Sequence, residues 1–254
     1  MSDPLYPPRD ETSELRPPKR KLPRKNDPGW DYFWLSTAII IIVLQYYFLV
    51  NLNIPIERYL VIAQVALVGL IITFMISSKL VVDGYSVAKQ AICYMGSMTG
   101  RRSGSSNKWA LVFFIAFGLL YGVLNFMLMH FYTTHYPEMT GLRVSSVFLF
   151  ISTLVIIMMS LIPIDVHELK HLFTALLVFT ITELASFASA IHFIANKINY
   201  PLLYVVVAIE LVLAVLYVWG YITNYRYTAV FQKTCSMCTG IAFYLYLSYF
   251  ISIM

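Results

Sequence analysis

The sequence contains little charge for its length. Its 254 residues include 18 Lys and Arg and 13 Asp and Glu, so that 12% are charged, whereas about 25% is typical of soluble domains. Twelve of these charged residues fall within residues 1–27, which leaves 19 for the remaining 227. A water-soluble fold of this size must cover its surface with polar groups. The scarcity of charge therefore predicts that the chain after residue 30 is embedded in a membrane.

Cysteine is also scarce, and the three present are Cys93, Cys235 and Cys238. They are too few and too unevenly spaced for a disulfide framework. The segment from Cys235 to Cys238 is a single CxxC without a second pair, so we interpret it as small residues at a helix start, with a zinc or redox site as the alternative. Nucleotide loops, nucleophile elbows and cofactor fingerprints are missing too. We therefore expect no cofactor and no nucleic-acid partner.

Long apolar runs dominate what remains, and 59% of the residues are hydrophobic. A scan for runs of about 20 apolar residues predicts an all-α, polytopic transmembrane helix bundle. Seven spans are expected, at residues 31–50, 59–76, 109–130, 144–161, 169–195, 201–222 and 235–254. The last span is the weakest, because its uninterrupted apolar part begins only at Ile241. Six spans are the alternative.

The distribution of Lys and Arg predicts the orientation of these spans. Fifteen of the 18 fall in the tail or in alternate connections on the same side, and only Arg58, Arg143 and Lys197 fall on the other. Because basic residues are retained in the cytoplasm, we expect a cytoplasmic N-terminus. The sequence indicates an integral, multi-pass membrane protein without indicating which membrane holds it.

The spans divide the chain into four predicted regions. Residues 1–30 form a disordered basic tail that attracts anionic lipid headgroups. Residues 31–76 form an N-terminal transmembrane helix pair. Residues 77–108 form a cytoplasmic linker that is basic and rich in Gly and Ser, with an interfacial helix in its first half. Residues 109–254 form the C-terminal transmembrane bundle.

Two carboxylic acids, Glu183 and Glu210, fall inside predicted spans, where a charge costs roughly 2.5–3.5 kcal/mol. Glu183 lies 12 residues before the end of its span and Glu210 nine residues after the start of the next, so both lie about 14–18 Å deep. The short connection at residues 196–200 makes the two helices neighbours. We expect the carboxyl groups to face each other and share a proton. The alternative is packing through hydrogen bonds to Gln45, Gln64 or Asn125.

The connection after the fourth span contains His167, Glu168 and His171 in the spacing HExxH. Two histidines at i and i+4 share a helix face and could bind zinc, with the glutamate as general base. A third ligand in helical register is missing. We therefore expect no metal site here and keep a membrane metalloenzyme as a lesser alternative.

The same connection carries a further pattern, formed by Pro163, Asp165, His171 and Ala175. It resembles the signature between helices in domain-of-unknown-function family 998, a distant relative of the FGF-receptor-activating and damage-regulated autophagy modulator proteins. Ile162 stands where that family usually has Phe, and Tyr136-Pro-Glu138 resembles a Pro-Glu pair of the autophagy-modulator branch. The resemblance covers about residues 108–254. It implies a compact helix bundle linked with lipid or membrane organisation, with Pro163, Asp165 and His171 at the headgroup boundary.

Three functions remain open from the sequence. The first is a non-enzymatic membrane protein, either an accessory subunit that binds another membrane protein or a factor that interacts with membrane lipids. The second is a proton- or cation-coupled transporter that uses Glu183 and Glu210. The third is the metalloenzyme that would act through His167, Glu168 and His171.

Overall fold

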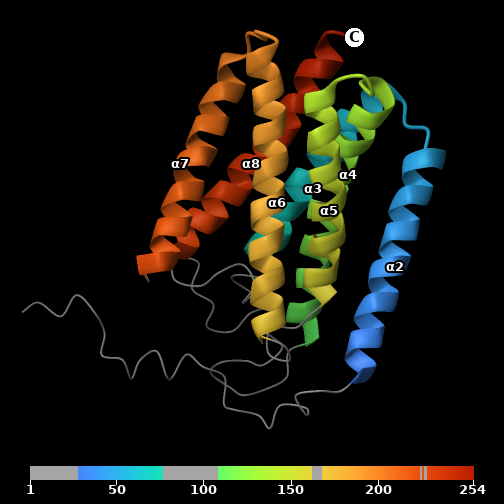
Figure 1. The fold of residues 1–254 in the computed structure, drawn as a ribbon, viewed down its shortest axis with the longest axis vertical. Helices are drawn as coiled ribbons and strands as arrows, with labels where there is room; N and C mark the ends of the chain where they lie inside the picture. The colour runs from blue at the N-terminus through green and yellow to red at the C-terminus, as the bar shows by residue number, and fades with distance from the viewer. Residues whose placement is uncertain (1–27, 77–107, 162–167, 224, 226–227) are drawn as a thin grey trace, which may run out of the picture.

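The computed structural model describes residues 28–76, 108–161, 168–223, 225 and 228–254. This part of the chain is all-helical and contains seven helices (Figure 1). They are α2 (Pro28–Asn51), α3 (Ile56–Ile76), α4 (Lys108–His135), α5 (Thr140–Leu161), α6 (Glu168–Ala195), α7 (Pro201–Thr223) and α8 (Thr228–Ser252). The predicted helix bundle is therefore confirmed.

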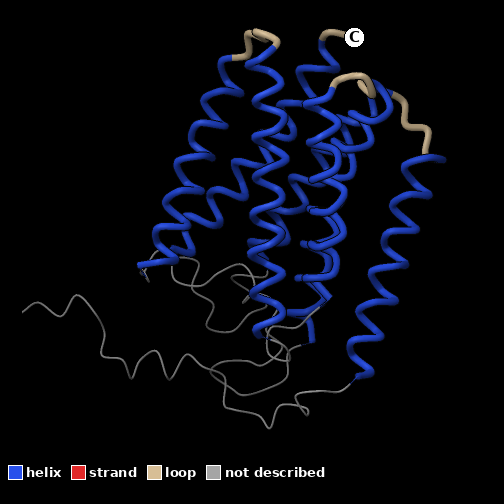
Figure 2. Tube along the Cα trace, viewed as in Figure 1, coloured by secondary structure: helices blue, strands red, loops and turns tan. Residues whose placement is uncertain are grey.

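Successive helices run in opposite directions, so that the short connections between α2 and α3, α4 and α5, and α6 and α7 lie at one end of the bundle (Figure 2). Proline helps to define these turns. Pro201 occupies the first position of α7, where its fixed φ suits a helix and its missing N–H costs nothing. Residue Lys197 in the same connection has a positive φ of 53°.

Six helices are long and apolar enough to cross a membrane, and α2 is the exception. Its apolar part, Leu35–Asn51, is shorter. The last span, which was expected to be the weakest, is the least hydropathic of the six, but α8 still qualifies over Thr228–Ser252. Its polar first half includes buried Gln232, Cys235 and Thr239. These side chains face other helices rather than lipid, so a scan for lipid-compatible residues undervalues the segment.

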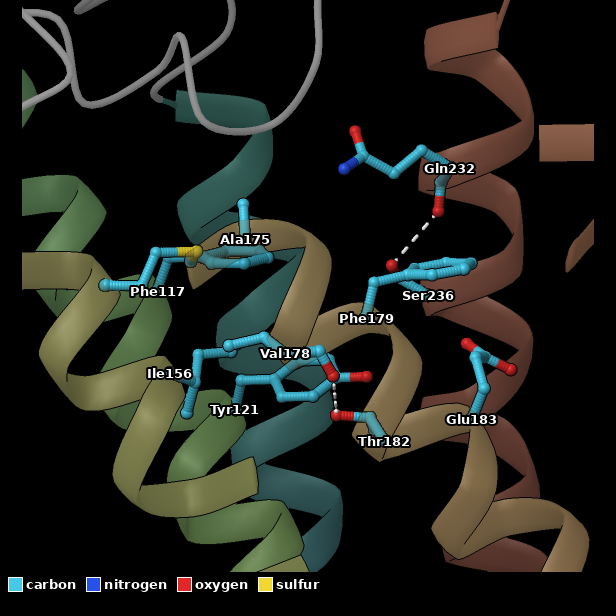
Figure 3. A pocket seen from close by; sticks show the side chains of 11 residues that line it. Phe117, Tyr121, Ile156, Ala175, Val178, Phe179, Thr182, Glu183, Gln232 and Ser236 are labelled. Atoms are coloured by element: carbon cyan, nitrogen blue, oxygen red, sulfur yellow. Dashed lines mark hydrogen bonds between the residues drawn. The ribbon is translucent and has the colours of Figure 1, made fainter. Parts of the chain in front are cut away.

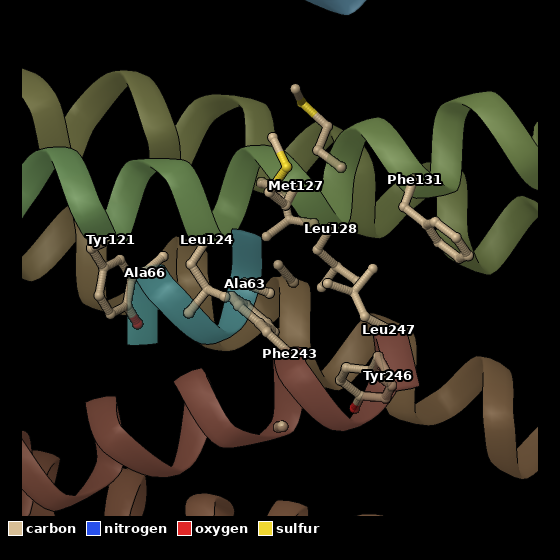
Figure 4. Close-up of a cluster of buried hydrophobic side chains, with 14 of the residues drawn as sticks. Ala63, Ala66, Tyr121, Leu124, Met127, Leu128, Phe131, Phe243, Tyr246 and Leu247 are labelled. Carbon is tan, nitrogen blue, oxygen red and sulfur yellow. The ribbon is translucent and has the colours of Figure 1, made fainter. Parts of the chain in front are cut away.

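The core lies where α3, α4 and α8 meet (Figure 4). Ala63 and Ala66 of α3 let this helix approach Leu124 and Leu128 of α4, and Phe243 of α8 packs into the same cluster. α3 thus packs with the C-terminal helices, whereas α2 lies against α5. Most side chains of α2 and α7 are exposed on the outside of the bundle, as expected of helices that face lipid.

Small hydroxyl residues join α4, α5 and α6. Ser189 of α6 donates to Ser145 of α5 at 2.9 Å, and Ser145 donates to the carbonyl of Ala185 at the same distance. Asn125 of α4 donates to Ser152 of α5 at 3.0 Å. Hydroxyls of this kind allow close helix approach and satisfy one another away from water. They fix α6 in the bundle and thereby set the position of Glu183.

Candidate functional site

Glu183 and Glu210 lie near the middles of α6 and α7, and both are buried, with 5% and 0% of their surfaces exposed. The connection at residues 196–200 joins the two helices at one end. Away from that end, α7 packs mainly against α8 and only slightly against α6. α8 therefore lies beside both glutamates. The prediction of a facing pair did not include this helix.

Two residues of α8 contact the carboxyl group of Glu183. Thr239 Oγ1 lies 2.9 Å from Glu183 Oε1, and Cys235 Sγ lies 3.5 Å from the same oxygen. Cys235 Sγ is also 3.4 Å from the backbone carbonyl oxygen of Glu210. Cys235 therefore lies between α6 and α7 and connects the two glutamates.

Glu210 has its own hydroxyl partner on α6. Ser186 Oγ donates to Glu210 Oε2 at 2.9 Å, and Ser186 lies three residues after Glu183, on the same side of α6. The two carboxyl groups also lie within interaction range of each other. The structure thus brings together both glutamates, Ser186, Cys235 and Thr239 in a cluster that we call the carboxyl site.

At the carboxyl site, two side chains that can each donate one hydrogen bond both have two acceptors within reach. Thr239 Oγ1 lies 2.9 Å from the Cys235 carbonyl oxygen as well as from Glu183 Oε1, yet a hydroxyl carries one proton. Cys235 Sγ likewise has one proton and two acceptors within reach. A proton on the Glu183 carboxyl would supply a further donor for these contacts.

One oxygen of each carboxyl group has no hydrogen-bond partner among the described residues. These atoms are Glu183 Oε2 and Glu210 Oε1, and both are inaccessible to solvent. A buried acceptor without a partner costs roughly 1–3 kcal/mol. Both oxygens are therefore available to bind a proton or a small cation.

Glu183 lines a small cavity of about 50 Å³. Figure 3 shows Glu183 extending from α6 towards α8, with Tyr121 of α4 and Thr182 of α6 on the opposite side. Gln232 and Ser236 of α8 also line the cavity. Most of the lining is apolar, but these polar side chains could bind water, and a space of this size can hold one or two water molecules beside Glu183.

The polar residues proposed as packing partners lie elsewhere, so that part of the prediction was wrong. Asn125 binds Ser152, and Gln64 Nε2 donates to Tyr244 OH at 2.7 Å. The amide of Gln45 is buried without a hydrogen-bond partner in the described part of the chain. The glutamates instead use hydroxyl and thiol groups of α6 and α8. The small hydroxyl residues near Glu183 in the sequence could have indicated hydroxyl partners on α6. Nothing in the sequence indicated that Cys235 and Thr239 of α8 would contact the glutamates.

Only part of the HExxH segment falls within the described residues. Pro163, Asp165 and His167 lie outside them, and Glu168 is the first residue of α6. His171 is fully buried, and its ring centroid lies 5.7 Å from that of Phe114 in α4. Among the described residues, no group of three His, Cys, Asp or Glu is placed to hold a metal ion. The roles predicted for this segment remain predictions.

A second polar contact, which the sequence did not indicate, fixes the connection between α2 and α3. His130 Nε2 lies 2.9 Å from the carbonyl oxygen of Leu52, which can only accept, so this nitrogen carries the proton. Nδ1 then accepts from Tyr59 OH at 2.6 Å. Both side chains are buried. His130 therefore anchors the start of α3 and the end of α4 to each other.

Together, the six membrane-length helices and their apolar outer surfaces define an integral, multi-pass α-helical membrane protein. The chain matches no family model, no curated protein and no solved structure. The resemblance of residues 108–254 to domain-of-unknown-function family 998 therefore remains a prediction.

Proposed function

We propose that the protein is a proton-coupled membrane carrier in which Glu183 and Glu210 bind and release a shared proton. One observation supports this above all others: two buried carboxyl groups from different helices meet, and each keeps an oxygen that has no partner among the described residues. Two negative charges in contact inside a membrane repel strongly, so one proton on the pair is the stable state.

Release of that proton would act on α7. The added negative charge would push Glu210 away from Glu183, and α7 has little other packing against α6 to resist the movement. The cavity beside Glu183 offers a place for the water that would accept the proton. Protonation would thus favour one arrangement of α7 and deprotonation another, which is the two-state behaviour that coupling requires.

The groups that face this pair belong to several helices. Tyr121 of α4 interacts with both glutamates, as do Cys235 and Cys238 of α8. Tyr246 of α8 interacts with Glu210 and donates to the carbonyl of Ser186 at 2.9 Å. None of these four groups is cationic, and a proton on the pair would remove one of its two negative charges.

Proton flux into proteoliposomes tests the proposal. The purified chain is reconstituted with a pH-sensitive dye inside, and a potassium gradient with valinomycin sets the membrane potential. We expect flux from the natural protein and its loss in both Glu183→Gln and Glu210→Gln. The two variants should be non-additive, because a shared proton belongs to the pair.

Glu138→Gln is the matched control, since Glu138 is exposed in the connection between α4 and α5. It should leave flux unchanged. Full flux in both buried variants, with the folded protein recovered, would mean that the carboxyl site serves packing alone and would overturn the proposal. A parallel measurement with a sodium gradient distinguishes coupling to protons from coupling to a cation. The accessory-subunit and lipid-interaction hypotheses remain alternatives to this function.

A further inference from the structure

A second and larger cavity, of about 240 Å³, lies between α3, α4 and α8. Most of its wall is apolar and comes from Leu67, Leu70 and Phe74 of α3, Phe117 of α4 and Met237 of α8. An apolar cavity of about 150 Å³ is enough to bind benzene. This cavity therefore has room for a larger molecule, of about the size of two fused aromatic rings.

The wall of the larger cavity offers no free charge to a ligand. The described residues that line it include no carboxylate that could pair with a cation. Lys233 also lines it, but this lysine is buried and already interacts with another group of the chain, so we assign it no contact with a ligand. The remaining polar groups are the hydroxyls of Tyr121, Thr234 and Ser236. Because a charge without a partner is costly to bury, the cavity suits an uncharged molecule.

The larger cavity shares part of its wall with the small cavity beside Glu183. Phe117, Tyr121 and Ser236 line both. Figure 3 shows Phe117 and Tyr121 on one side of the small cavity and Ser236 on the other. Phe117 and Tyr121 are buried, and closely packed side chains transmit displacements to their neighbours. A molecule that shifts these side chains from the larger cavity therefore changes the space beside Glu183.

We propose that the larger cavity is the substrate site of the carrier and that the substrate is an uncharged, lipophilic molecule. This inference rests on the proposed proton-carrier function, because it names the class of substrate for that carrier. The substrate would enter from the membrane past Val230 and Thr234, two lining residues that are exposed. It would then contact Tyr121, which also lines the cavity beside Glu183. If protonation of the glutamates changes the affinity for the substrate, the substrate must change the affinity for the proton by the same factor.

Photolabelling of the full chain in phosphatidylcholine nanodiscs tests binding. The probe is phenyl(trifluoromethyl)diazirine, a small uncharged aromatic compound, and mass spectrometry locates the label. Labelling of surfaces that face lipid rises in proportion to the probe concentration, whereas labelling inside a binding site saturates. We expect saturable labelling at the residues of α3, α4 and α8 that line the larger cavity, and its displacement by excess naphthalene. Labelling that saturates nowhere in the chain would overturn the proposal.

Charged analogues test the class of substrate in the natural protein, so this comparison does not depend on the folding of a variant. The competitors are naphthoate, an anion, and naphthylmethylammonium, a cation. At equal concentration in the membrane, both should compete about 100-fold more weakly than naphthalene, as the cost of placing a charge inside a membrane protein implies. Competition by either ion as strong as that by naphthalene would overturn the assignment of an uncharged substrate.

Two tryptophan variants test the location of the site. Met237→Trp fills the larger cavity and should abolish the saturable labelling. Val65→Trp is the matched control, because Val65 belongs to the same region of α3 but 64% of its surface is exposed. It should leave the saturable labelling unchanged. Saturable labelling that survives in Met237→Trp would place the bound probe elsewhere and overturn the proposal.

Proton flux separates the substrate site from the carrier function on which it rests. Naphthalene should raise flux into proteoliposomes of the natural protein about five-fold, the lower end of typical couplings between two sites, without raising flux into protein-free liposomes. Glu183→Gln should lose the flux but keep the saturable labelling. Saturable labelling together with a flux that naphthalene leaves unchanged would overturn the substrate role alone. Absence of flux from the natural protein, with and without naphthalene, would instead overturn the carrier function and the substrate role together.

Discussion

At the scale of single residues, the polar groups of this protein are placed where they complete contacts between helices that are distant in sequence. Tyr59 and His130 are 71 residues apart, and Thr239 and Glu183 are 56 apart. Removing one partner of a buried hydrogen bond destabilises the fold, because the other partner is left buried without a hydrogen bond. Single substitutions at such contacts should therefore have measurable effects.

Tyr59→Phe removes the hydroxyl that donates to His130 Nδ1 at 2.6 Å and leaves that nitrogen only the longer contact with Thr134 Oγ1, at 3.5 Å. We expect the free energy of unfolding to fall by about 1–3 kcal/mol. Titration with SDS, followed by circular dichroism, measures it. Tyr244→Phe is the control, because Tyr244 accepts a hydrogen bond from the exposed Gln64, and its loss should cost less than about 0.5 kcal/mol. Equal effects of the two variants would contradict a special role for the Tyr59–His130 contact.

Lys197 is the second residue after the end of α6, and its backbone adopts a left-handed conformation. Ile198 N donates to the Phe193 carbonyl at 3.0 Å, and Lys197 N donates to the Ile194 carbonyl at 3.0 Å. This is the Schellman pattern, which favours glycine at the left-handed position. Lys197→Gly should therefore raise the free energy of unfolding by about 0.5–1 kcal/mol. Lys197→Ala, which keeps the strain, should give no such gain.

At the scale of helices, close approach depends on small residues at crossing points. One example is Gly118 of α4 against Ser160 of α5, where an added Cβ would lie 2.5 Å from Ser160 Cβ. Gly122 on the same helix has more space, since its Cβ would first meet Ile157 at 3.4 Å. α4 and α5 are among the most extensively packed helices, so this crossing affects the whole bundle.

Gly118→Ala should lower the free energy of unfolding by about 1–3 kcal/mol, because neither helix can move away without losing its other contacts. Ser160→Gly in the same chain removes the atom that the new Cβ meets and should restore most of the loss. Gly122→Ala is the matched control and should be tolerated. Thermal melting of the detergent-solubilised variants compares all four proteins, and a Gly118→Ala variant as stable as the natural chain would contradict this crossing.

At the scale of the whole molecule, the alternation of the helices places their connections at two ends of the bundle (Figure 1). At one end, Lys197 lies in a connection, and Arg58 and Arg143 lie in the first turns of α3 and α5. The positive-inside rule therefore predicts that this end lies away from the cytoplasm. The carboxyl site lies between the two ends, whereas Lys233 lies towards the end predicted to be cytoplasmic.

This orientation can be tested with single cysteines at Thr140 and Ser105. Thr140 is exposed at the start of α5, and Ser105 lies outside the described residues in the basic linker. Cys93 and Cys238 are replaced by serine, and buried Cys235 is kept. A membrane-impermeant maleimide should label Thr140→Cys and Ser105→Cys from opposite sides of sealed vesicles. Labelling of both from the same side would contradict the predicted topology.

The sequence by itself determined the class of the protein and the heights of its groups in the membrane. Runs of apolar residues must form helices in lipid, because no water is present to satisfy the backbone. Residue counts along a helix convert directly into depth, which is why Glu183 and Glu210 could be placed at similar depths. Depth alone does not determine which way a side chain faces around its helix.

Only the tertiary structure decided those directions and the neighbours that follow from them. α8 lies beside both glutamates and supplies Cys235 and Thr239, although these residues are 25 to 56 positions away in sequence. The polar first half of α8 became a membrane-length helix because its polar groups found partners inside the bundle. The rotation of each helix is set by packing against all its neighbours at once, and that information is not contained in any single segment of the chain.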